Sequence, residues 1–550
     1  MLKRYDHQRR ILFLLLFLTL FFSLLVLRLT FIQIINSEEL TKWAVRQRSQ
    51  SIVLGHGRGD IQDRNERSLL NGAQEEAIVA FPSIYRGKED LIGFDSSSKY
   101  IIDKILSPPH AQFPFIVERG RMGSLAFSPD HVIPGVVKVA VQGRYSSHVL
   151  AAHVVGHIRN SDGEGQKGIE LFYNAELSSG QPPLLSAFVD GKKNLIGGLG
   201  IRLRNASSGY LQPYNVILTI DYDLQEYVEK IMDAHISQGA VVVMNPSTGD
   251  ILAMASRPNY QPGCVEDYLG RKDGPFNNRG TISYQPGSVF KTVLAAAAFE
   301  EGLVSLFQDC SCYGAVELPE GRIPCPHVHP HADLTFTEAF AYSCNTTFIR
   351  LGQELGAEKI ERYARLLGLG EEVGLPLGED AGCIPSPDQL KNEIALANTS
   401  IGQGLVQITP IQAAQMMAII ANDGKKVKPR LVDSITDCRN RTVKRFSCDK
   451  GTRVLSYSTV NKLKFMLNSV TTYGTGSDAA NLEYMVGGKT GTAQSGRRRE
   501  GREVLNHWFT GMAPLENSRV VVAVFIEEKG NVSAAEIFRI VSDKALSIIE

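Results

Sequence analysis

The chain has 550 residues, of which 43% are hydrophobic and 21% are charged. This composition is typical of globular proteins rather than of disordered ones, and the length predicts two or three domains. The 58 basic residues equal the 58 acidic residues in number, so no bulk positive charge indicates binding to nucleic acid.

The first 35 residues differ from the rest of the chain. Basic residues precede an uncharged apolar run from Ile11 to Leu27, and the apolar character resumes after Arg28 and continues to Ile35. This segment is long enough to span a bilayer core of about 30 Å, because the long side chain of Arg28 can carry its charge toward the membrane surface. The basic flank predicts that residues 1–10 face the cytoplasm and that residues 11–35 form the anchor.

The sequence after the apolar run shows no small-residue cleavage pattern, so we expect an uncleaved anchor rather than a removed signal peptide. The protein is then expected to be a single-pass protein of the cell membrane, with everything from about residue 36 outside the cytoplasm. A buried helix of a soluble protein is the alternative interpretation.

Residues 36–215 alternate short apolar runs with Gly, Pro and Asn, which indicates mixed strands and loops. Two stretches are distinctive: Arg58–Asn65 is dense in charge, and Gly168–Tyr173 follows a glycine-rich loop. Neither combines a nucleophile, a base and an acceptor. We therefore expect both to form turns and ion pairs.

Residues 216–550 show clearer patterns, beginning with a strand at Val216–Ile220 and a helix at Asp221–His235. The apolar runs Gly239–Met244 and Asp250–Ala255 are joined by the turn-rich Asn245–Gly249, which predicts a β-hairpin.

Helices are predicted over most of the block from Leu334 to Gly404 and over Thr409–Asn422, which has Pro410 at its start. Strands and a last helix are predicted farther on, over Val486–Thr492, Trp508–Ala513, Val520–Ile526 and Ala534–Ile549. The fold class is therefore expected to be α+β, with helices packed on one antiparallel sheet.

A serine and a lysine stand three residues apart in the segment YQPGSVFK. The turn Gln285–Gly287 delivers Ser288 to the start of a predicted buried helix, which places Lys291 on the same helical face. A serine hydroxyl needs a neighbouring base, and a lysine in an apolar pocket can have its pKa lowered enough to serve as one. A helix start followed by a surface lysine is the alternative for this pair alone.

Two further motifs lie 55 and 201 residues after Ser288. The first, Ser343-Cys-Asn345, offers a hydroxyl for proton transfer and an amide for holding a peptide backbone. The second begins at Lys489, which offers positive potential for a substrate carboxylate. Of the residues that follow, Thr490 and Thr492 can donate hydrogen bonds, and Gly491 is expected to keep side-chain bulk away from a substrate lying along the strand. A nucleophile, a base and a proton relay are what the transfer of an acyl group from a peptide requires. That reaction also needs hydrogen-bond donors for the oxyanion, and we expect these to be the backbone N–H groups of Ser288 and Thr492.

Eight cysteines are present, and an extracytoplasmic location permits disulfides. Disulfides or free thiols are the favoured state, with Cys325 pairing with Cys310 or Cys312 and Cys438 pairing with Cys448. A metal site is the alternative, with Cys325, His327 and His331 as candidate ligands in a cluster that also holds Cys310, Cys312 and His329. Their spacing matches no standard zinc finger.

The three motifs, in this order and spacing, resemble those of the class B penicillin-binding proteins, the D,D-transpeptidases that cross-link bacterial peptidoglycan. The resemblance covers nearly the whole chain and includes the anchor and these segments: Arg58–Asn65, Gly168–Tyr173, Leu218–Asp221, Gly249–Met254, Tyr284–Lys291, Gly402–Gly404, Lys489–Gln494 and His507–Gly511. It implies a penicillin-binding, serine-β-lactamase-like transpeptidase domain at 216–550. An elongated α/β pedestal or dimerisation-type domain at 36–215 would precede it.

The resemblance also implies the reaction. Ser288 would attack the penultimate D-alanine of a stem pentapeptide, release the terminal D-alanine, and pass the acyl group to an amine of a neighbouring stem peptide. β-Lactams would acylate Ser288. Lys291, Ser343, Asn345 and Lys489 would complete the catalytic set, with Thr490, Gly491 and Thr492 binding substrate. No cofactor is implied, and a multi-span wall glycosyltransferase is the implied partner.

Two other functions use the same motifs. A β-lactamase or β-lactam sensor needs neither an anchor nor about 180 residues ahead of its catalytic domain. A scaffold with a decayed active site is disfavoured because every motif residue is present. The sequence does not separate roles in division, elongation and sporulation.

Overall fold

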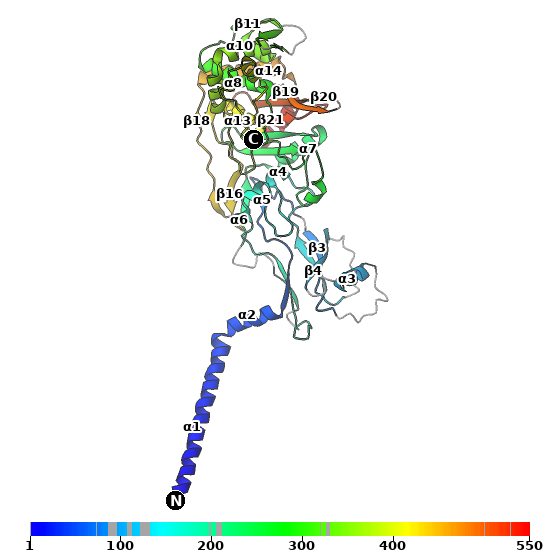
Figure 1. The fold of residues 1–550 in the computed structure, drawn as a ribbon, viewed down its shortest axis with the longest axis vertical. Coiled ribbons are helices and arrows are strands. Elements are labelled where there is room, and N and C mark those ends of the chain that lie inside the picture. Colours follow the sequence, from blue (N-terminus) through cyan, green and yellow to red (C-terminus); the bar gives the residue numbers. More distant parts are fainter. Residues whose placement is uncertain are drawn as a thin grey trace. The chain divides into compact units, whose positions relative to one another are not determined.

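The computed structural model describes residues 2–72, 74–85, 96–106, 113–121, 133–196, 200–204, 212–319, 321–325, 331–499, 501–528 and 530–549 (Figure 1). The chain forms two compact units. The first contains Met1–Gly55, Gln74–Gln142 and Pro182–Ser208, and the second contains His56–Ala73, Gly143–Gln181 and Gly209–Glu550. The division therefore differs from a single boundary near residue 215.

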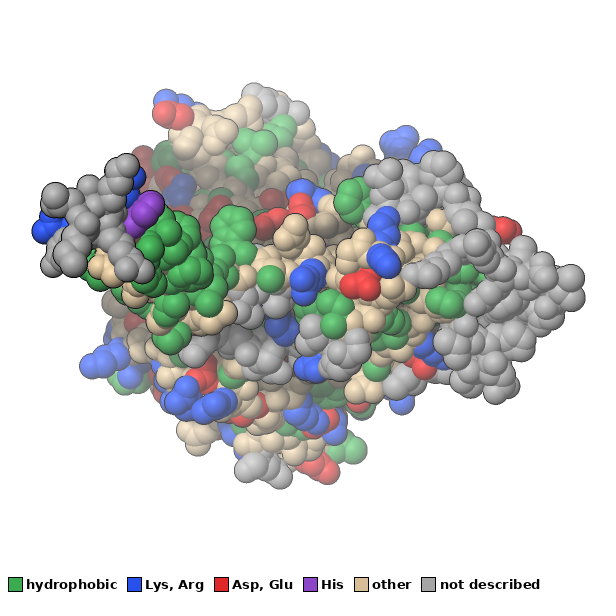
Figure 2. Space-filling view, turned by 90° about the horizontal axis from the view of Figure 1, so that it is seen from below, with side chains coloured by type: hydrophobic (Ala, Val, Ile, Leu, Met, Phe, Trp, Pro, Cys, Tyr) green, Lys and Arg blue, Asp and Glu red, His purple; other side chains and the backbone are tan. Residues whose placement is uncertain are grey.

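The first unit begins with the predicted apolar helix. Helix α1 (Leu2–Thr30) continues through a π-helical turn (Phe31–Ile35), and α2 (Ser37–Arg48) follows. Within the span His7–Ile35, an 18-residue stretch has a mean hydropathy of 2.7 and none of that stretch is buried, so the helix is long and apolar enough to cross a membrane. Hydrophobic side chains gather along this helix in the space-filling view (Figure 2).

Two three-stranded sheets form the rest of the first unit. In one sheet the strand order is β1 (Ser49–Val53), β6 (Leu184–Phe188), β7 (Ile201–Arg204). In the other sheet the order is β4 (Phe115–Arg121), β3 (Gln74–Ala80), β5 (Val136–Gln142). Alternate residues of β3 enter different cores: Val79 packs with Leu185, whereas Ile78 packs with Ile101 of α3 (Ser96–Leu106). This alternation follows from the two-residue period of a strand.

The two charged stretches singled out in the sequence contact each other in the second unit. Glu170, on α5 (Gly168–Phe172), is fully buried and accepts hydrogen bonds from Arg58 at 2.8 Å, from Arg144, and from the Tyr145 hydroxyl at 2.8 Å. The interpretation of these stretches as structural is thus confirmed. The cluster joins residues 56–73 to residues 143–181 within the second unit.

Short elements surround this cluster. They are α4 (Ala152–Val155), α6 (Asn174–Leu177), and a four-stranded sheet ordered β17 (Thr442–Arg445), β16 (Val432–Thr436), β8 (Asn215–Leu218), β2 (Ile61–Gln62). Strand β2 pairs in parallel with β8, which ties the Arg58 segment to the predicted strand at 216–220.

A five-stranded antiparallel sheet lies at the centre of the second unit, as predicted. Its order is β10 (Ile251–Arg257), β9 (Gly239–Met244), β21 (Val520–Ile526), β20 (Arg502–Ala513), β19 (Gly487–Arg499). Helices cover both faces. Val241 and Val243 pack with α7 (Tyr222–His235) and α15 (Ala534–Ile549), and Val242 packs on the opposite face with α8 (Lys291–Glu300) and α13 (Pro410–Ala421).

The helical block predicted at 334–404 contains α9 (Phe336–Ala341), α10 (Asn345–Leu355), α11 (Ala357–Leu366) and α12 (Glu393–Ser400). Helix α14 (Tyr457–Thr472) was not predicted, although its buried Val460, Leu463, Leu467 and Val470 follow a helical period. Figure 1 shows α8, α10 and α14 in one region beside β19. The remaining strands form three pairs: β11 (Asp309–Cys312) with β14 (Ala332–Thr335), β12 (Ala315–Leu318) with β13 (Gly321–Pro324), and β15 (Lys425–Lys426) with β18 (Thr452–Arg453).

Candidate active site

Ser288 lies where a turn enters a buried helix, as the sequence predicts. A 3-10 turn (Gly287–Phe290) carries Ser288 and runs directly into α8, whose first residue is Lys291. Gly287 has φ +54°, and a Cβ there would lie 2.3 Å from the carbonyl oxygen of Thr492. Only glycine fits both the left-handed backbone and this close approach, so Gly287 holds the Ser288 turn directly against strand β19.

Lys291 is fully buried, and its amine contacts the second motif. Its Nζ donates to the backbone oxygen of Ser343 at 2.7 Å and to Oδ1 of Asn345 at 2.8 Å, and it lies 3.2 Å from the Ser343 hydroxyl. A neutral amine can donate its two N–H groups to the two oxygens that lie within 2.8 Å, and its one lone pair then remains to accept a proton. Burial lowers the pKa of Lys291 to about 7.

Ser343 occupies the turn between α9 and α10 in the left-handed conformation, with φ +60°. Backbone hydrogen bonds from Ser343 to Phe340 (3.1 Å) and from Cys344 to Ala339 (2.7 Å) hold the turn. Non-glycine residues with such backbones persist only where their surroundings fix them, often at functional sites. Here the strained residue presents both its backbone oxygen and its hydroxyl to Lys291.

The third motif lies on β19. Lys489 is fully buried, with its Nζ 5.4 Å from the centroid of the Phe340 ring. Burial and the neighbouring Lys291 charge lower the pKa of Lys489 well below its usual range. Thr490 shares a 2.6 Å hydroxyl–hydroxyl contact with Thr475.

Gly491 lines the cavity and also packs closely against the turn that carries Ser288. A Cβ at this position would lie 2.4 Å from the backbone oxygen of Pro286, in the turn that carries Ser288. The missing side chain therefore lets β19 approach the turn that carries Ser288.

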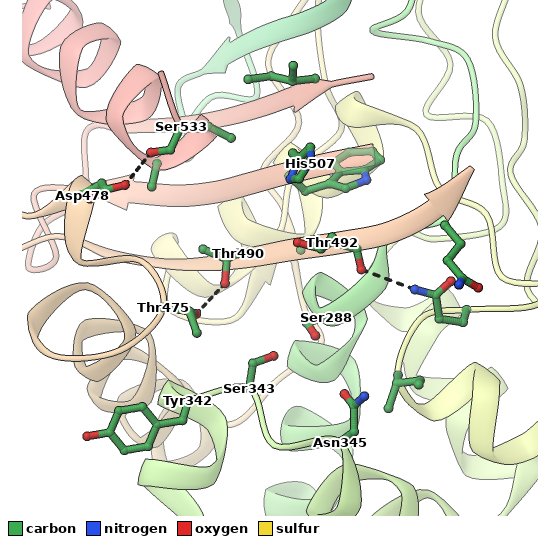
Figure 3. Close-up of a pocket in the computed structure, with 18 of the residues that line it drawn as sticks. Ser288, Tyr342, Ser343, Asn345, Thr475, Asp478, Thr490, Thr492, His507 and Ser533 are labelled. Atoms are coloured by element: carbon green, nitrogen blue, oxygen red, sulfur yellow. Dashed lines mark hydrogen bonds between the residues drawn. The ribbon is translucent and has the colours of Figure 1, made fainter. Parts of the chain in front are cut away.

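One cavity of about 780 Å³ joins the three motifs. Ser288, Ser343, Asn345 and the Thr490–Thr492 segment line it and face one another in Figure 3. Lys291 and Lys489 are buried behind this lining. The predicted site residues are thus brought together from segments up to 201 residues apart in the sequence.

Sequence reasoning missed other lining residues, namely Tyr342, Gln403, Thr475, Asp478, His507 and Ser533. Gln403 and His507 belong to segments noted only for their family resemblance. His507 is the register partner of Thr492 across β19 and β20, so only the strand pairing reveals its place. Thr475 and Asp478 belong to no motif, and Asp478 accepts a hydrogen bond from Ser533 at 2.7 Å.

The cysteines are all in the described part of the chain, and none of the eight forms a disulfide. The predicted pairs of Cys325 with Cys310 or Cys312, and of Cys438 with Cys448, are therefore not formed. Cys325 and His331 do lie together, with Sγ and Nδ1 3.5 Å apart. His327 and His329 lie outside the described residues.

Comparisons with known proteins agree with this geometry. The sequence model of the penicillin-binding protein transpeptidase domain matches residues 239–543, more than half of the chain. The stage V sporulation protein D of Bacillus subtilis is 28% identical over 559 residues, covering 96% of this chain and 82% of that protein. The penicillin-binding protein PbpB of Mycolicibacterium smegmatis is 32% identical over 402 residues, covering 70% of this chain and 60% of that protein.

Solved structures show the same fold. Penicillin-binding protein 3 of Mycobacterium tuberculosis in complex with aztreonam has a TM-score of 0.65 at 25% identity, covering 91% of this chain and 97% of that one. The D,D-transpeptidase domain of a peptidoglycan glycosyltransferase from Eggerthella lenta has a TM-score of 0.63 at 29% identity, covering 75% of this chain and 93% of that one. With its three motifs gathered in one cavity, the chain belongs to the penicillin-binding protein transpeptidase family.

Proposed function

We propose that the protein is a serine-type peptidoglycan D,D-transpeptidase with Ser288 as its nucleophile. The observation that most supports this is the single cavity lined by Ser288, by Ser343 and Asn345, and by the Thr490–Thr492 segment. Family membership supports the same activity, because relatives carry the name peptidoglycan D,D-transpeptidase.

In the first step, neutral Lys291 takes the proton of the Ser288 hydroxyl as the oxygen attacks the carbonyl carbon of the penultimate D-alanine. The contacts of Lys291 with Ser343 and Asn345 support this role, since they fix the amine without requiring it to be charged. The oxyanion that forms accepts hydrogen bonds from the backbone N–H groups of Ser288 and Thr492. The tight approach of Gly287 to Thr492 supports this pairing of donors.

Collapse of the tetrahedral intermediate breaks the peptide bond. The terminal D-alanine leaves as an amine that receives a proton through the Ser343 hydroxyl, and an ester to Ser288 remains. In the second step, an amine of a neighbouring stem peptide attacks this ester, loses its proton to the same relay, and forms the cross-link. Ser288 is regenerated as the hydroxyl.

Substrate recognition is assigned to β19. Thr490 and Thr492 would donate hydrogen bonds to the substrate carboxylate, and Lys489 beneath them would provide positive charge. The lowered pKa of Lys489 is compatible with this role, because a bound carboxylate favours the protonated amine. β-Lactams would acylate Ser288 in place of the stem peptide, as related structures with aztreonam and ampicillin suggest.

The helix at His7–Ile35 supports the location proposed for the protein. Residues 1–10 would be cytoplasmic, residues 11–35 would form a single anchor in the cell membrane, and the catalytic domain would be extracytoplasmic. The part of the first compact unit that follows the anchor would act as the pedestal. A multi-span wall glycosyltransferase is the partner proposed to supply the glycan strands that the enzyme cross-links.

Mass spectrometry of the full chain in detergent, after incubation with a penicillin, tests the nucleophile. We expect a lasting adduct on Ser288 and no adduct in Ser288→Ala. Rapid hydrolysis of the penicillin without a lasting adduct would indicate a β-lactamase. A folded protein that never reacts would indicate a scaffold.

A second test uses the contact between β19 and the turn that carries Ser288. In Gly491→Ala, the new Cβ meets the Pro286 oxygen, so Ser288 and β19 must move apart. Because a misplacement of about 1 Å costs roughly 10²-fold in rate, we expect penicillin acylation to slow by about that factor. Gly270→Ala is the matched control, since a Cβ there has no atom within 4 Å. Equal rates for the two variants would contradict the packing role of Gly491.

A further inference from the structure

Four potential metal ligands converge behind the turn that carries Ser343. They are the thiols of Cys312, Cys325 and Cys344 and the imidazole of His331, and their ligand atoms all lie within 4.8 Å of one another. The three cysteines are 0–5% exposed and pack with Ala339 and Leu334. The sequence makes Cys325 and His331 candidate ligands and places Cys312 in the same Cys/His cluster. Cys344 joins them through the fold.

Backbone pairing explains the convergence. Cys312 ends β11 and is the register partner of Ala332, the residue after His331. Cys325 follows β13 and donates its backbone N–H to Gly314 at 2.8 Å, which holds it beside the end of β11. Cys344 comes from the turn between α9 and α10. Two strand pairs and one turn between helices therefore each contribute to a single cluster.

The separations between the ligand atoms are close to those of a four-coordinate zinc site. In a zinc site with Zn–S near 2.3 Å and Zn–N near 2.0 Å, neighbouring ligand atoms are about 3.5–3.8 Å apart. The distance of 3.5 Å from Cys325 Sγ to His331 Nδ1 agrees with this. Cys344 Sγ also has the hydroxyls of Thr346 and Thr347 at 3.1 Å and 3.4 Å, contacts that suit a thiolate ligand supported from outside the metal shell.

We infer that Cys312, Cys325, His331 and Cys344 bind one Zn²⁺ as a closed structural site that holds the Ser343–Asn345 turn against Lys291. Three sulfurs and one imidazole nitrogen suit Zn²⁺, whereas Mg²⁺ and Ca²⁺ require oxygen ligands. Cys344 lies between the two residues that contact the Lys291 amine. A metal bond to Cys344 therefore fixes both contacts at once.

Metal content of the full chain, purified in detergent without chelators, tests the binding. We expect about one zinc per chain by elemental analysis. Cys312→Ser and His331→Ala are expected to lose it, whereas Cys310→Ser, two residues from Cys312 but outside the cluster, retains it. Zinc below about 0.2 per chain, a different metal, or equal zinc in Cys312→Ser and Cys310→Ser would overturn the inference. So would a Cys325–Cys344 disulfide in non-reducing peptide maps.

The positioning role rests on the proposed function and needs a separate measurement. A chelator that strips zinc from the unmutated chain is expected to slow penicillin acylation at least 10-fold, and Zn²⁺ but not Mg²⁺ is expected to restore the rate. Because zinc is removed and restored without any substitution, this test does not depend on variants that could fail to fold. An unchanged rate after complete removal of zinc would overturn the positioning role. A chain that binds zinc and never reacts with penicillin would instead refute the proposed function, because metal content is measured independently.

Discussion

Replacing Lys291 with Met is expected to slow acylation by penicillin by about 10²–10⁴-fold, the range typical of a lost general base. Met fills a similar volume, so the fully buried position stays packed, but it cannot accept the Ser288 proton. The rate constant for adduct formation, followed by mass spectrometry under excess penicillin, measures the effect. Lys425→Met, at an exposed position on β15, is the control.

The pH dependence separates loss of the base from loss of structure. Burial lowers the pKa of Lys291 to about 7, so the neutral, basic form increases as the pH rises through 7. We expect the acylation rate of the unmutated chain to rise about tenfold per pH unit below pH 7 and to level off above it. In Lys291→Met this rise of the rate with pH should disappear. If the variant keeps this pH dependence, or if its acylation rate is within threefold of that of the unmutated chain, Lys291 is excluded as the base.

The local geometry of this site could be predicted because it depends on short spacings. The turn at Gln285–Gly287 and the three-residue step from Ser288 to Lys291 fix the serine and the lysine through helix geometry alone. The strands at 239–244 and 520–526 were equally clear, because both are apolar throughout and bounded by turns.

The other residues of the site could not be predicted, because their positions depend on contacts between distant segments. His507 reaches the cavity only through its register with Thr492, and Cys344 reaches Cys325 only through the turn after α9. A one-residue change of register would turn His507 to the other face of the sheet, and no local pattern specifies that register. The missed α14 is a different error, since its helical period was present in the sequence.

The same reasoning predicts a large effect on stability at Glu170. This carboxylate is 0% exposed and binds both Arg58 and Arg144. Burial opposes its charge, but Arg144 and Arg58 outweigh burial and lower the pKa of Glu170 below 4.5. Glu170→Gln keeps the shape and removes the charge, leaving two buried guanidinium groups without their partner. We expect the free energy of unfolding to fall by about 3–5 kcal/mol.

Urea unfolding of the full chain in detergent, followed by circular dichroism, measures this loss. Asp223→Asn is the matched control, because its pair with Arg67 is similar in length but exposed, and such pairs contribute about 1 kcal/mol or less. The sign of the pH effect provides a second check. With a lowered pKa in the folded state, Glu170 contributes its full stability above pH 4.5 and loses it as the pH falls through that lowered value. Glu170→Gln should therefore lose part of the acid sensitivity of the unmutated chain. Equal destabilisation by the two variants would show that the buried cluster contributes no more than a surface pair, even though Glu170 joins segments more than 100 residues apart.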